Sequence, residues 1–305
     1  MDLFLSDLKL EALLSQARRV FFLEAGDLMH SFCSQLFELL QPGVEEQPDS
    51  ASLTLLLQDC LGTRYPSWAD QFSVEYDPKE LTGLSGLHLH LRLSWPLTLV
   101  LTQANLATYS AVFQFLAGVK RSLWALQAIR PGRLQQMEEQ YDLDVSSLSL
   151  STQDVSLPIG CKQHRLQLLR SWLLYFTTTV HGYFMSRVVH STELELRAKL
   201  STATDLDVIL AVHQEYLDRI HDRCFLHPSA SMLREAVSRV LALGLELQQA
   251  TSSPLPIHTR TLLAWEETYS RCHKFLASTL QAMTTRRKVP HLEGLTVALL
   301  HSCPC

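Results

Sequence analysis

Leucine and aromatic residues recur every three or four positions along most of the chain, the spacing that places side chains on one face of an α-helix. The helices that this pattern predicts cover residues 3–23, 28–40, 53–61, 102–129, 163–200, 206–220, 230–249, 258–285 and 291–301. Pro-Gly pairs at 42–43 and 131–132 end two of these patterns, as helix breakers do. Thr204 and Asp207 have the spacing of a capping box and predict the start of a helix.

One short segment follows a different period. Residues 87–93 read Leu-His-Leu-His-Leu-Arg-Leu, and strict alternation is the pattern of a strand with one buried face. Pro96 cannot continue a central strand, so we expect a strand end or an edge strand here. The predicted fold class is mainly α: an elongated helical bundle with one small β element at about 72–95.

The segment 131–161 interrupts the helical pattern. It mixes acidic and serine-rich stretches without periodicity, and a stretch of this kind is typical of a mobile loop insertion. We therefore predict a first helical bundle with the small β element over 1–130, the insertion over 131–161, and a second helical bundle over 162–305. The two bundles are expected to pack as one continuous domain.

Composition excludes several classes of protein. The chain of 305 residues is 47% hydrophobic, which is too apolar for a disordered chain. Its formal net charge of −5 offers no dense basic face for nucleic acid, and no apolar run reaches the 18 or so residues that span a membrane. We read no signal peptide after Met1-Asp2. Seven scattered cysteines fit a reducing cytosol better than a disulfide framework.

The search for chemistry finds no catalytic motif. Phosphate-binding glycine loops are absent from the sequence, so no cofactor is predicted. His88 and His90 share a strand face, so both could reach one metal ion, but a zinc site needs three or four ligands, and a solvated face is the preferred interpretation. Cys303 and Cys305 stand at a free terminus, where fraying is expected.

Two further groups have structural interpretations. The acidic residues Glu138, Glu139, Asp142 and Asp144 fall in the predicted loop, where a charge run is usually solvated. His213 and Tyr216 lie three positions apart on a predicted helix, which favours pairing inside a helical bundle over catalysis. From spacing alone the chain is predicted to be a helical interaction module with no evident catalyst and no metal site.

A set of motifs follows in order along nearly the whole chain. They are Phe22-Leu23-Glu24-Ala25-Gly26-Asp27-Leu28, Trp95-Pro96-Leu97, Tyr109, Phe113, Phe115-Leu116, Lys120-Arg121, the run from Leu168 to Val189, Asp205-Leu206, His213-x-x-Tyr216-Leu217 and Pro290-His291-Leu292-Glu293. Together they resemble the C-terminal half of the gamma-tubulin complex component family. Two positions depart from the family pattern: Leu28 replaces a Phe, and Ile129-Arg130 stand where the family has a Trp.

The resemblance implies a function. The family is helical and non-enzymatic; its C-terminal domain binds gamma-tubulin, and its members join to present gamma-tubulins in a ring that templates a microtubule. It implies gamma-tubulin and other gamma-tubulin complex components as partners, and the cytoplasm, the cytoskeleton, the microtubule organising centre, the centrosome and the spindle pole as locations. Neither nucleic acid nor a membrane is expected as a partner. Because only the C-terminal half is matched, we expect the chain to hold gamma-tubulin and to contribute weakly, or not at all, to lateral ring assembly.

The contact residues are a separate hypothesis. Loops on a rigid helical body are favoured contact sites, so Glu24, Gly26 and Asp27, with Lys120 and Arg121, are the candidate partner-binding residues. The alternative for these residues is a helix-terminating turn and a solvated basic pair.

Two other functions compete with this one. A different helical tethering or scaffold protein would share the leucine-rich stripes without needing the Trp95-Pro96-Leu97 motif before a Tyr-x-x-x-Phe helix. An enzyme of unfamiliar geometry would require a concave pocket with converging titratable groups.

Overall fold

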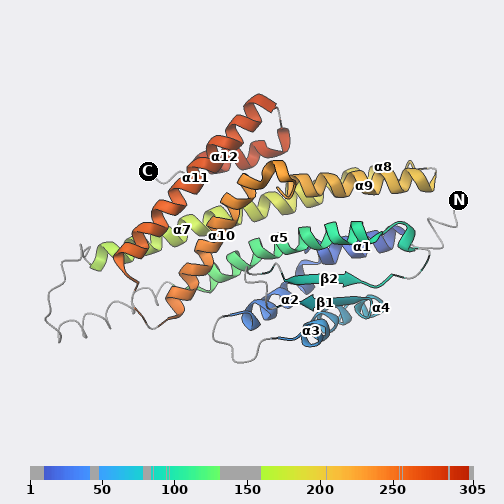
Figure 1. The fold of residues 1–305 in the computed structure, drawn as a ribbon, viewed down its shortest axis with the longest axis horizontal. Coiled ribbons are helices and arrows are strands. Elements are labelled where there is room, and N and C mark those ends of the chain that lie inside the picture. The colour runs from blue at the N-terminus through green and yellow to red at the C-terminus, as the bar shows by residue number, and fades with distance from the viewer. Residues whose placement is uncertain are drawn as a thin grey trace. The chain divides into compact units, whose positions relative to one another are not determined.

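The structure, a computed structural model, describes residues 10–41, 48–77, 84, 86–93, 95, 97–130, 159–203, 205–253, 255, 257–287 and 289–301. These residues form helices and one small sheet (Figure 1), which confirms the predicted mainly α class with a small β element. The α-helices are α1 (Leu10–Phe21), α2 (Gly26–Leu39), α3 (Ser50–Gly62), α4 (Pro66–Ala69), α5 (Gln103–Ala128), α7 (Ile159–Tyr183), α8 (Ser191–Leu200), α9 (Leu206–Arg223), α10 (Ser231–Ser252), α11 (Thr259–Arg287) and α12 (Glu293–His301). In the part of the chain described here, no helix has both the length and the apolar character needed to cross a membrane.

The chain divides into two compact units, and each combines two separate stretches of sequence. Unit 1 comprises Met1–Arg121 and Phe184–Ser231, and unit 2 comprises Ser122–Tyr183 and Met232–Cys305. The sequence-based division at 130 and 162 assigns one contiguous stretch to each bundle and stays a prediction. Of the predicted insertion 131–161, residues 131–158 lie outside the described part of the chain, and α7 begins at Ile159.

The β element is a two-stranded antiparallel sheet of β1 (Phe72–Tyr76) and β2 (Leu87–Leu91). Its register pairs Phe72 with Leu91 at one end and Tyr76 with Leu87 at the other. The leucines of β2 are buried, while His88 is half-buried and His90 is exposed. The alternation in the sequence therefore predicted the buried face of this strand correctly.

Helix α3 covers the outer edge of β1. Three polar side chains at four-residue spacing lie on one helical face, and they bond the backbone groups that the strand leaves unpaired. The Val74 N–H donates to Thr54 Oγ1 at 3.0 Å and the Tyr76 N–H donates to Ser50 Oγ at 2.9 Å, while Gln58 Nε2 donates to the Phe72 carbonyl at 3.1 Å. An edge strand that would otherwise attract another chain is thus closed by a helix.

Aromatic residues fill the core of unit 1. Phe22 stacks on Tyr109 with ring centroids 5.0 Å apart, and Phe21 contacts the same ring at 5.3 Å. Phe184 meets Phe115 and Phe225 edge to face. Because Phe184 and Phe225 come from the second stretch of the unit, that stretch completes the core around α1 and α5.

In unit 2 the buried face of α7 packs against α11. Trp172 stacks on Tyr269 at 6.0 Å, and Phe176 meets the same tyrosine edge to face at 6.4 Å. Arg165 of α7 donates from Nε to Glu266 of α11 at 3.0 Å. These contacts fix the register of the two helices.

The predicted single helix over 163–200 contains a segment that the sequence pattern did not reveal. Between α7 and α8 the residues Phe184–His190 form a π-helix. Thr192 Oγ1 lies 2.6 Å from the Val188 carbonyl and 3.2 Å from the Val189 carbonyl, so it bonds backbone oxygens at the end of the π segment. The predicted cap of the next helix is also displaced: Asp205 occupies the N-cap position of α9, and Thr204 lies outside the described residues.

Candidate partner-binding site

The turn between α1 and α2 is held rigidly from inside. Leu23 has a φ of 59°, a left-handed conformation that costs a residue other than glycine roughly 1–2 kcal/mol. The Phe22 N–H donates to the Arg18 carbonyl at 2.8 Å and the Ala25 N–H donates to the Arg19 carbonyl at 3.0 Å. Phe22 and Leu23 are buried. Their burial offsets the strain and presents the next residues, Glu24 to Asp27, in one fixed arrangement.

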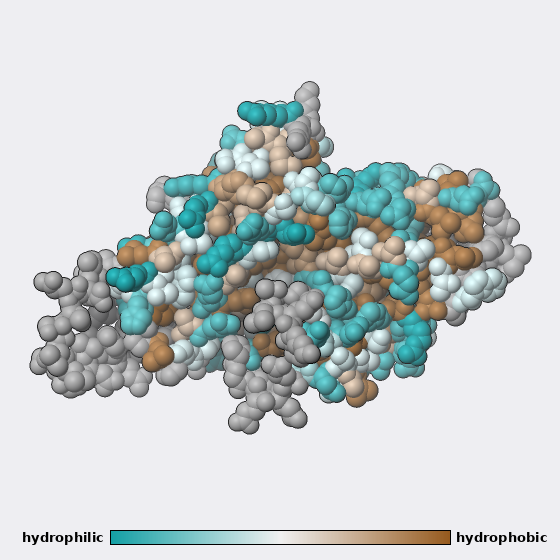
Figure 2. All heavy atoms as spheres, in the orientation of Figure 1, coloured by the Kyte–Doolittle hydropathy of each residue, from teal (hydrophilic) through white to brown (hydrophobic). Residues whose placement is uncertain are grey.

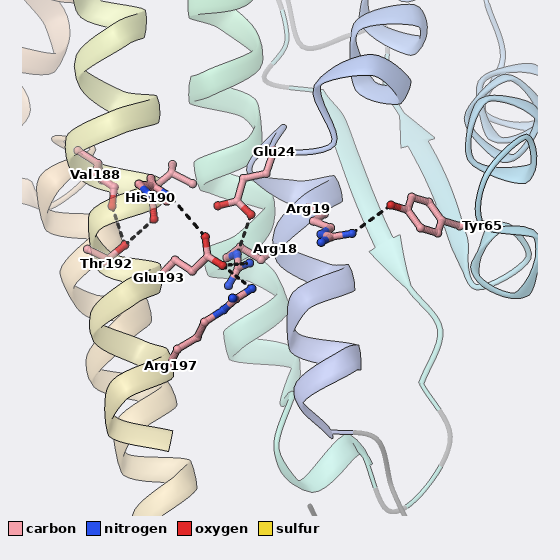
Figure 3. Close-up of polar contacts among 10 residues, drawn as sticks. Arg18, Arg19, Glu24, Tyr65, Val188, His190, Thr192, Glu193 and Arg197 are labelled. Atoms are coloured by element: carbon pink, nitrogen blue, oxygen red, sulfur yellow. Dashed lines mark hydrogen bonds and ion pairs between the residues drawn. The ribbon is translucent and has the colours of Figure 1, made fainter. Parts of the chain in front are cut away.

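Glu24 lies in a cluster of four charged side chains, of which Arg18, Glu24 and Glu193 are largely buried and Arg197 is exposed (Figure 3). Arg18 Nε donates to Glu24 Oε2 at 2.7 Å, and Arg18 Nη2 donates to Glu193 Oε1 at 2.5 Å. Arg197 reaches the same Glu193 oxygen at 2.8 Å, four residues further along α8. Arg18 is only 4% exposed, so its charge depends on these carboxylates. The cluster ties the α1–α2 turn to α8, more than 160 residues further along the chain.

The carboxylates keep Arg18 charged in this setting. Burial by itself lowers the pKa of Arg18, but the hydrogen bond to Glu24 and the negative charges of Glu24 and Glu193 outweigh it, so the pKa of Arg18 is raised. The cluster therefore holds the turn in place, and Glu24 is committed to Arg18 rather than free on the surface.

Gly26 and Asp27 lie at the start of α2 and are accessible. Asp27 Oδ2 pairs with Arg64 Nη1 at 2.5 Å, and both side chains are 60% exposed. The hydrogen bond to the Leu28 backbone, with the nearby Arg64 adding to it, lowers the pKa of Asp27. A Cβ on Gly26 would meet no atom within 4 Å, so this glycine borders open space.

Arg121 lies at the other end of α2, and Lys120, which precedes it in α5, is close enough to Cys33 in the middle of α2 to interact with it electrostatically. Arg121 Nη2 donates to the Leu40 carbonyl at 3.1 Å, at the position that follows the last residue of α2, and burial lowers the pKa of Arg121. Lys120 is half-buried and makes no hydrogen bond or ion pair with another described residue. Helix α2 has 14 residues and is thus about 20 Å long. The five predicted residues therefore do not form one group: Glu24, Gly26 and Asp27 lie at the start of this helix, and Arg121 bonds the carbonyl that follows its end.

The sequence did not point to an aromatic group beside Asp27. Arg19 Nη1 donates to Tyr65 Oη at 3.0 Å, and the Tyr65 ring stacks on Trp68 at 4.1 Å with an angle of 3° between the ring planes. The Arg64 guanidinium lies 5.9 Å from the centre of the Tyr65 ring. The sequence did show the Arg18-Arg19 pair, but adjacent helical residues point about 100° apart, so Arg18 enters the buried cluster while Arg19 turns toward Tyr65 (Figure 3).

Apolar side chains give no comparable indication of a site. Figure 2 shows hydrophobic residues in several separate areas of the drawn face, each bordered by hydrophilic ones. Trp95, for example, is 79% exposed and Leu55 is 66% exposed. Single exposed apolar residues are common on protein surfaces, so the polar and aromatic groups around α2 remain the better-defined candidates.

Among the described residues, no group of three or more His, Cys, Asp and Glu side chains is arranged to hold a metal ion. His90 Nε2 lies 2.9 Å from Glu75 Oε2 on the exposed face of the sheet, and His88 Nδ1 lies 3.3 Å from Gln114 Nε2. Each histidine of β2 thus has its own polar neighbour.

Comparison with known proteins identifies the family. Residues 10–301 match the family model described as "Gamma tubulin complex component C-terminal". Gamma-tubulin complex component 5 of Mus musculus is 30% identical over 96% of this chain and 30% of its own length, and that of Macaca fascicularis is 29% identical over 96% of this chain and 42% of its own length. Gamma-tubulin complex component 6 of Homo sapiens is 27% identical over 98% of this chain and 17% of its own length.

The chain thus spans less than half the length of these relatives. Component 5 is also the family member that the end of the sequence suggests, and these overall identities support that suggestion. With a match that runs from the first described helix to the last, the chain belongs to the gamma-tubulin complex component family, in the region that the family model names C-terminal.

Proposed function

We propose that this chain is a gamma-tubulin-binding scaffold subunit of the gamma-tubulin ring complex that supports microtubule nucleation at centrosomes and spindle poles. The observation that carries the proposal is the family match over residues 10–301. The names of the relatives add to it, since they are gamma-tubulin complex components and, in Dictyostelium discoideum, a spindle pole body component. The proposed location is accordingly the cytoplasm, at the microtubule organising centre.

The physical basis of the function is effective concentration. Each gamma-tubulin that is held in place no longer loses its translational and rotational freedom when a microtubule nucleus forms. The protein then needs rigid geometry and carries out no reaction. The buried ionisable groups at the α1–α2 turn fit that requirement, because Arg18 pairs with Glu24 and Glu193 and so stiffens the turn.

We assign different parts in the contact to the five candidate residues. Gly26 and Asp27 are accessible, and Lys120 is half-buried without a bound partner among the described residues, so these three contact gamma-tubulin directly. Glu24 acts by holding the turn through Arg18, and Arg121 by bonding the carbonyl after α2.

A binding experiment with purified gamma-tubulin tests the proposal. The folded chain should retain gamma-tubulin on a column. Reversing the charge with Lys120→Glu should weaken binding roughly 3–10-fold, and more at low salt than at high salt, because exposed charges are screened. Arg260→Glu is the matched control, since Arg260 is an exposed arginine of α11 and belongs to unit 2.

The two parts of the proposal fail in different ways. A folded chain that does not retain gamma-tubulin contradicts the function itself. Equal binding by the Lys120→Glu and Arg260→Glu variants at every salt concentration removes only Lys120 from the contact.

A further inference from the structure

The surface beside Asp27 carries hydrogen-bond donors and aromatic rings that the contacts within the protein do not fully occupy. We call it the Arg19–Trp68 surface, and it consists of Arg19, Asp27, Arg64, Tyr65 and Trp68. Arg19 comes from α1, Asp27 from the start of α2, Arg64 and Tyr65 from the loop after α3, and Trp68 from α4. Four segments of unit 1 thus bring two guanidinium groups and two stacked aromatic rings together.

Arg19 is a cation with unused donors. A guanidinium has five N–H groups in a planar fork, and within the described part of the chain one bond of Arg19 is seen, to the neutral phenol of Tyr65. Glu24 is close enough to interact electrostatically with Arg19, but Arg18 already holds its carboxylate at 2.7 Å. A half-buried guanidinium bonded only to a phenol favours the approach of a carboxylate from outside.

The other residues complete a receptor for an anion. The ion pair between Arg64 and Asp27 is exposed on both sides, and such pairs are weak and exchangeable. Tyr65 and Trp68 lie flat against each other and are half-buried, so they give the surface a rigid apolar wall. Arg, Tyr and Trp are the residue types that carry most binding energy at protein interfaces.

Acidic neighbours do not cancel the positive charge. Asp59 of α3 and Asp70 after α4 are exposed, and neither forms an ion pair with Arg19 or Arg64 among the described residues. The Arg19 guanidinium is therefore open to a charge that a partner brings, and the Arg64 guanidinium becomes open when it releases Asp27.

We propose that the Arg19–Trp68 surface binds an acidic segment of the protein partner, with a carboxylate on the Arg19 guanidinium and the rest of the segment against Tyr65 and Trp68. The inference rests on the proposed function in one respect, since it takes gamma-tubulin as the partner that supplies this segment. Arg64 exchanges Asp27 for a second carboxylate of the segment.

Titration with deca-glutamate tests the surface without gamma-tubulin. In ¹H–¹⁵N spectra of the whole chain, the Trp68 indole and Arg19 Nε signals should shift in a saturable way, while the Arg260 Nε signal stays in place. Arg19→Gln should weaken this binding at least 5-fold, whereas Arg260→Gln should leave it unchanged. Shifts spread evenly over all arginines, or none at Arg19 and Trp68, would overturn the proposal.

Gamma-tubulin binding provides the second arm, with thermal melts to confirm that the variants are folded. Arg19→Gln should weaken gamma-tubulin binding at least 10-fold. Arg64→Gln changes an exposed residue and should weaken gamma-tubulin binding at least 3-fold. If Arg19→Gln misfolds, the result with Arg64→Gln tests the inference. Deca-glutamate should compete with gamma-tubulin for the wild-type chain.

Undiminished gamma-tubulin binding by the folded variants overturns this inference and leaves the proposed function intact. Saturable deca-glutamate binding by a chain that does not bind gamma-tubulin supports the acidic-segment site and refutes the proposed function.

Discussion

His213 is a buried histidine whose neighbours require it to be neutral. Its side chain is fully buried, with Nδ1 3.5 Å from Asn105 Nδ2 and Nε2 3.2 Å from Tyr109 Oη. The Asn105 amide also donates to the Val100 carbonyl at 3.1 Å, so it faces His213 as a donor. Nδ1 must then accept and cannot carry a proton. Burial lowers the pKa of His213 to about 4.

This histidine should make the stability of the protein fall in mild acid. Below the ordinary pKa of about 6.5 the unfolded chain binds a proton at His213, while the folded chain stays neutral down to about pH 4. Between pH 7 and pH 5 the free energy of unfolding should therefore drop by about 2 kcal/mol on account of this residue. Urea titrations at several pH values measure the drop.

The variant His213→Gln isolates this contribution. It is less stable than the wild type at pH 7 because it loses the bonds to Tyr109 and Asn105, but its stability should depend less on pH over the same range. His273, whose pKa burial also lowers, is present in both proteins and cancels from the comparison. Parallel pH profiles of wild type and variant would show that His213 is protonated in the folded state.

At the residue scale, sequence reasoning succeeded where periodicity determines burial. The spacing of His213 and Tyr216 predicted a pair inside a bundle, and both are buried with ring centroids 6.4 Å apart. It missed the aromatic group around Arg19, because Tyr65 and Trp68 meet it only through the folding of α3 and α4 against α1. Contacts between distant segments leave no periodic trace in a single sequence.

At the element scale, a close contact between α5 and α10 depends on a glycine. A Cβ placed on Gly244 would lie 2.7 Å from Ser122 Oγ and 3.3 Å from the Leu126 side chain. Ser122 Oγ in turn donates to the Leu241 carbonyl at 3.1 Å. The missing side chain thus lets a hydroxyl of one helix bond the backbone of the other.

Replacing this glycine should separate the two helices. Gly244→Ala should lower the free energy of unfolding by about 1–3 kcal/mol, because overpacking outweighs the better helix propensity of alanine. The matched control is Gly118→Ala in α5, where a Cβ would meet no atom within 4 Å, and where a gain of up to about 1 kcal/mol is expected.

The combination of Gly244→Ala with Ser122→Ala tests the cause directly. Removing the hydroxyl that the new methyl group strikes should restore part of the lost stability, so the two changes should be less than additive in urea unfolding. Additive losses would place the damage elsewhere in the helix.

The sequence predicted helix ends well where a helix-breaking Pro-Gly pair follows the helix. It did not predict irregular segments inside a helix. The predicted helix 102–129 corresponds to α5 (Gln103–Ala128), since the pair Pro131-Gly132 follows it. The π-helix Phe184–His190 escaped prediction because its apolar residues Phe184 and Val188 keep helical spacing in the sequence. The spacing of apolar residues is compatible with an α-helix and with a short π-helix, so this spacing does not show where the backbone hydrogen bonds change from one type to the other.

At the scale of the whole molecule, the chain returns to unit 1 after building part of unit 2. Unit 1 takes Phe184–Ser231 from the middle of the sequence, and that stretch supplies Glu193 for Arg18 and His213 for Tyr109. Phe22 likewise meets Tyr216 at 6.4 Å. Sequence periodicity predicts helices one by one, and it carries no information about which distant stretches share a core.

This arrangement predicts that the fragment 1–130 does not fold cooperatively by itself. Without α8 and α9 the fragment would expose the Phe22 and Tyr109 rings, and Arg18 would lose its ion pair with Glu193 and keep only the one with Glu24. Near-UV circular dichroism and urea unfolding of the fragment should show a weak, non-cooperative transition. A linked protein that joins 1–121 to 184–231 through a glycine-serine linker should recover a cooperative one, because it contains both stretches of unit 1. If the fragment 1–130 unfolds as cooperatively as the linked protein, the contiguous division at residue 130 is the better description and the contacts with α8 and α9 are dispensable for the core.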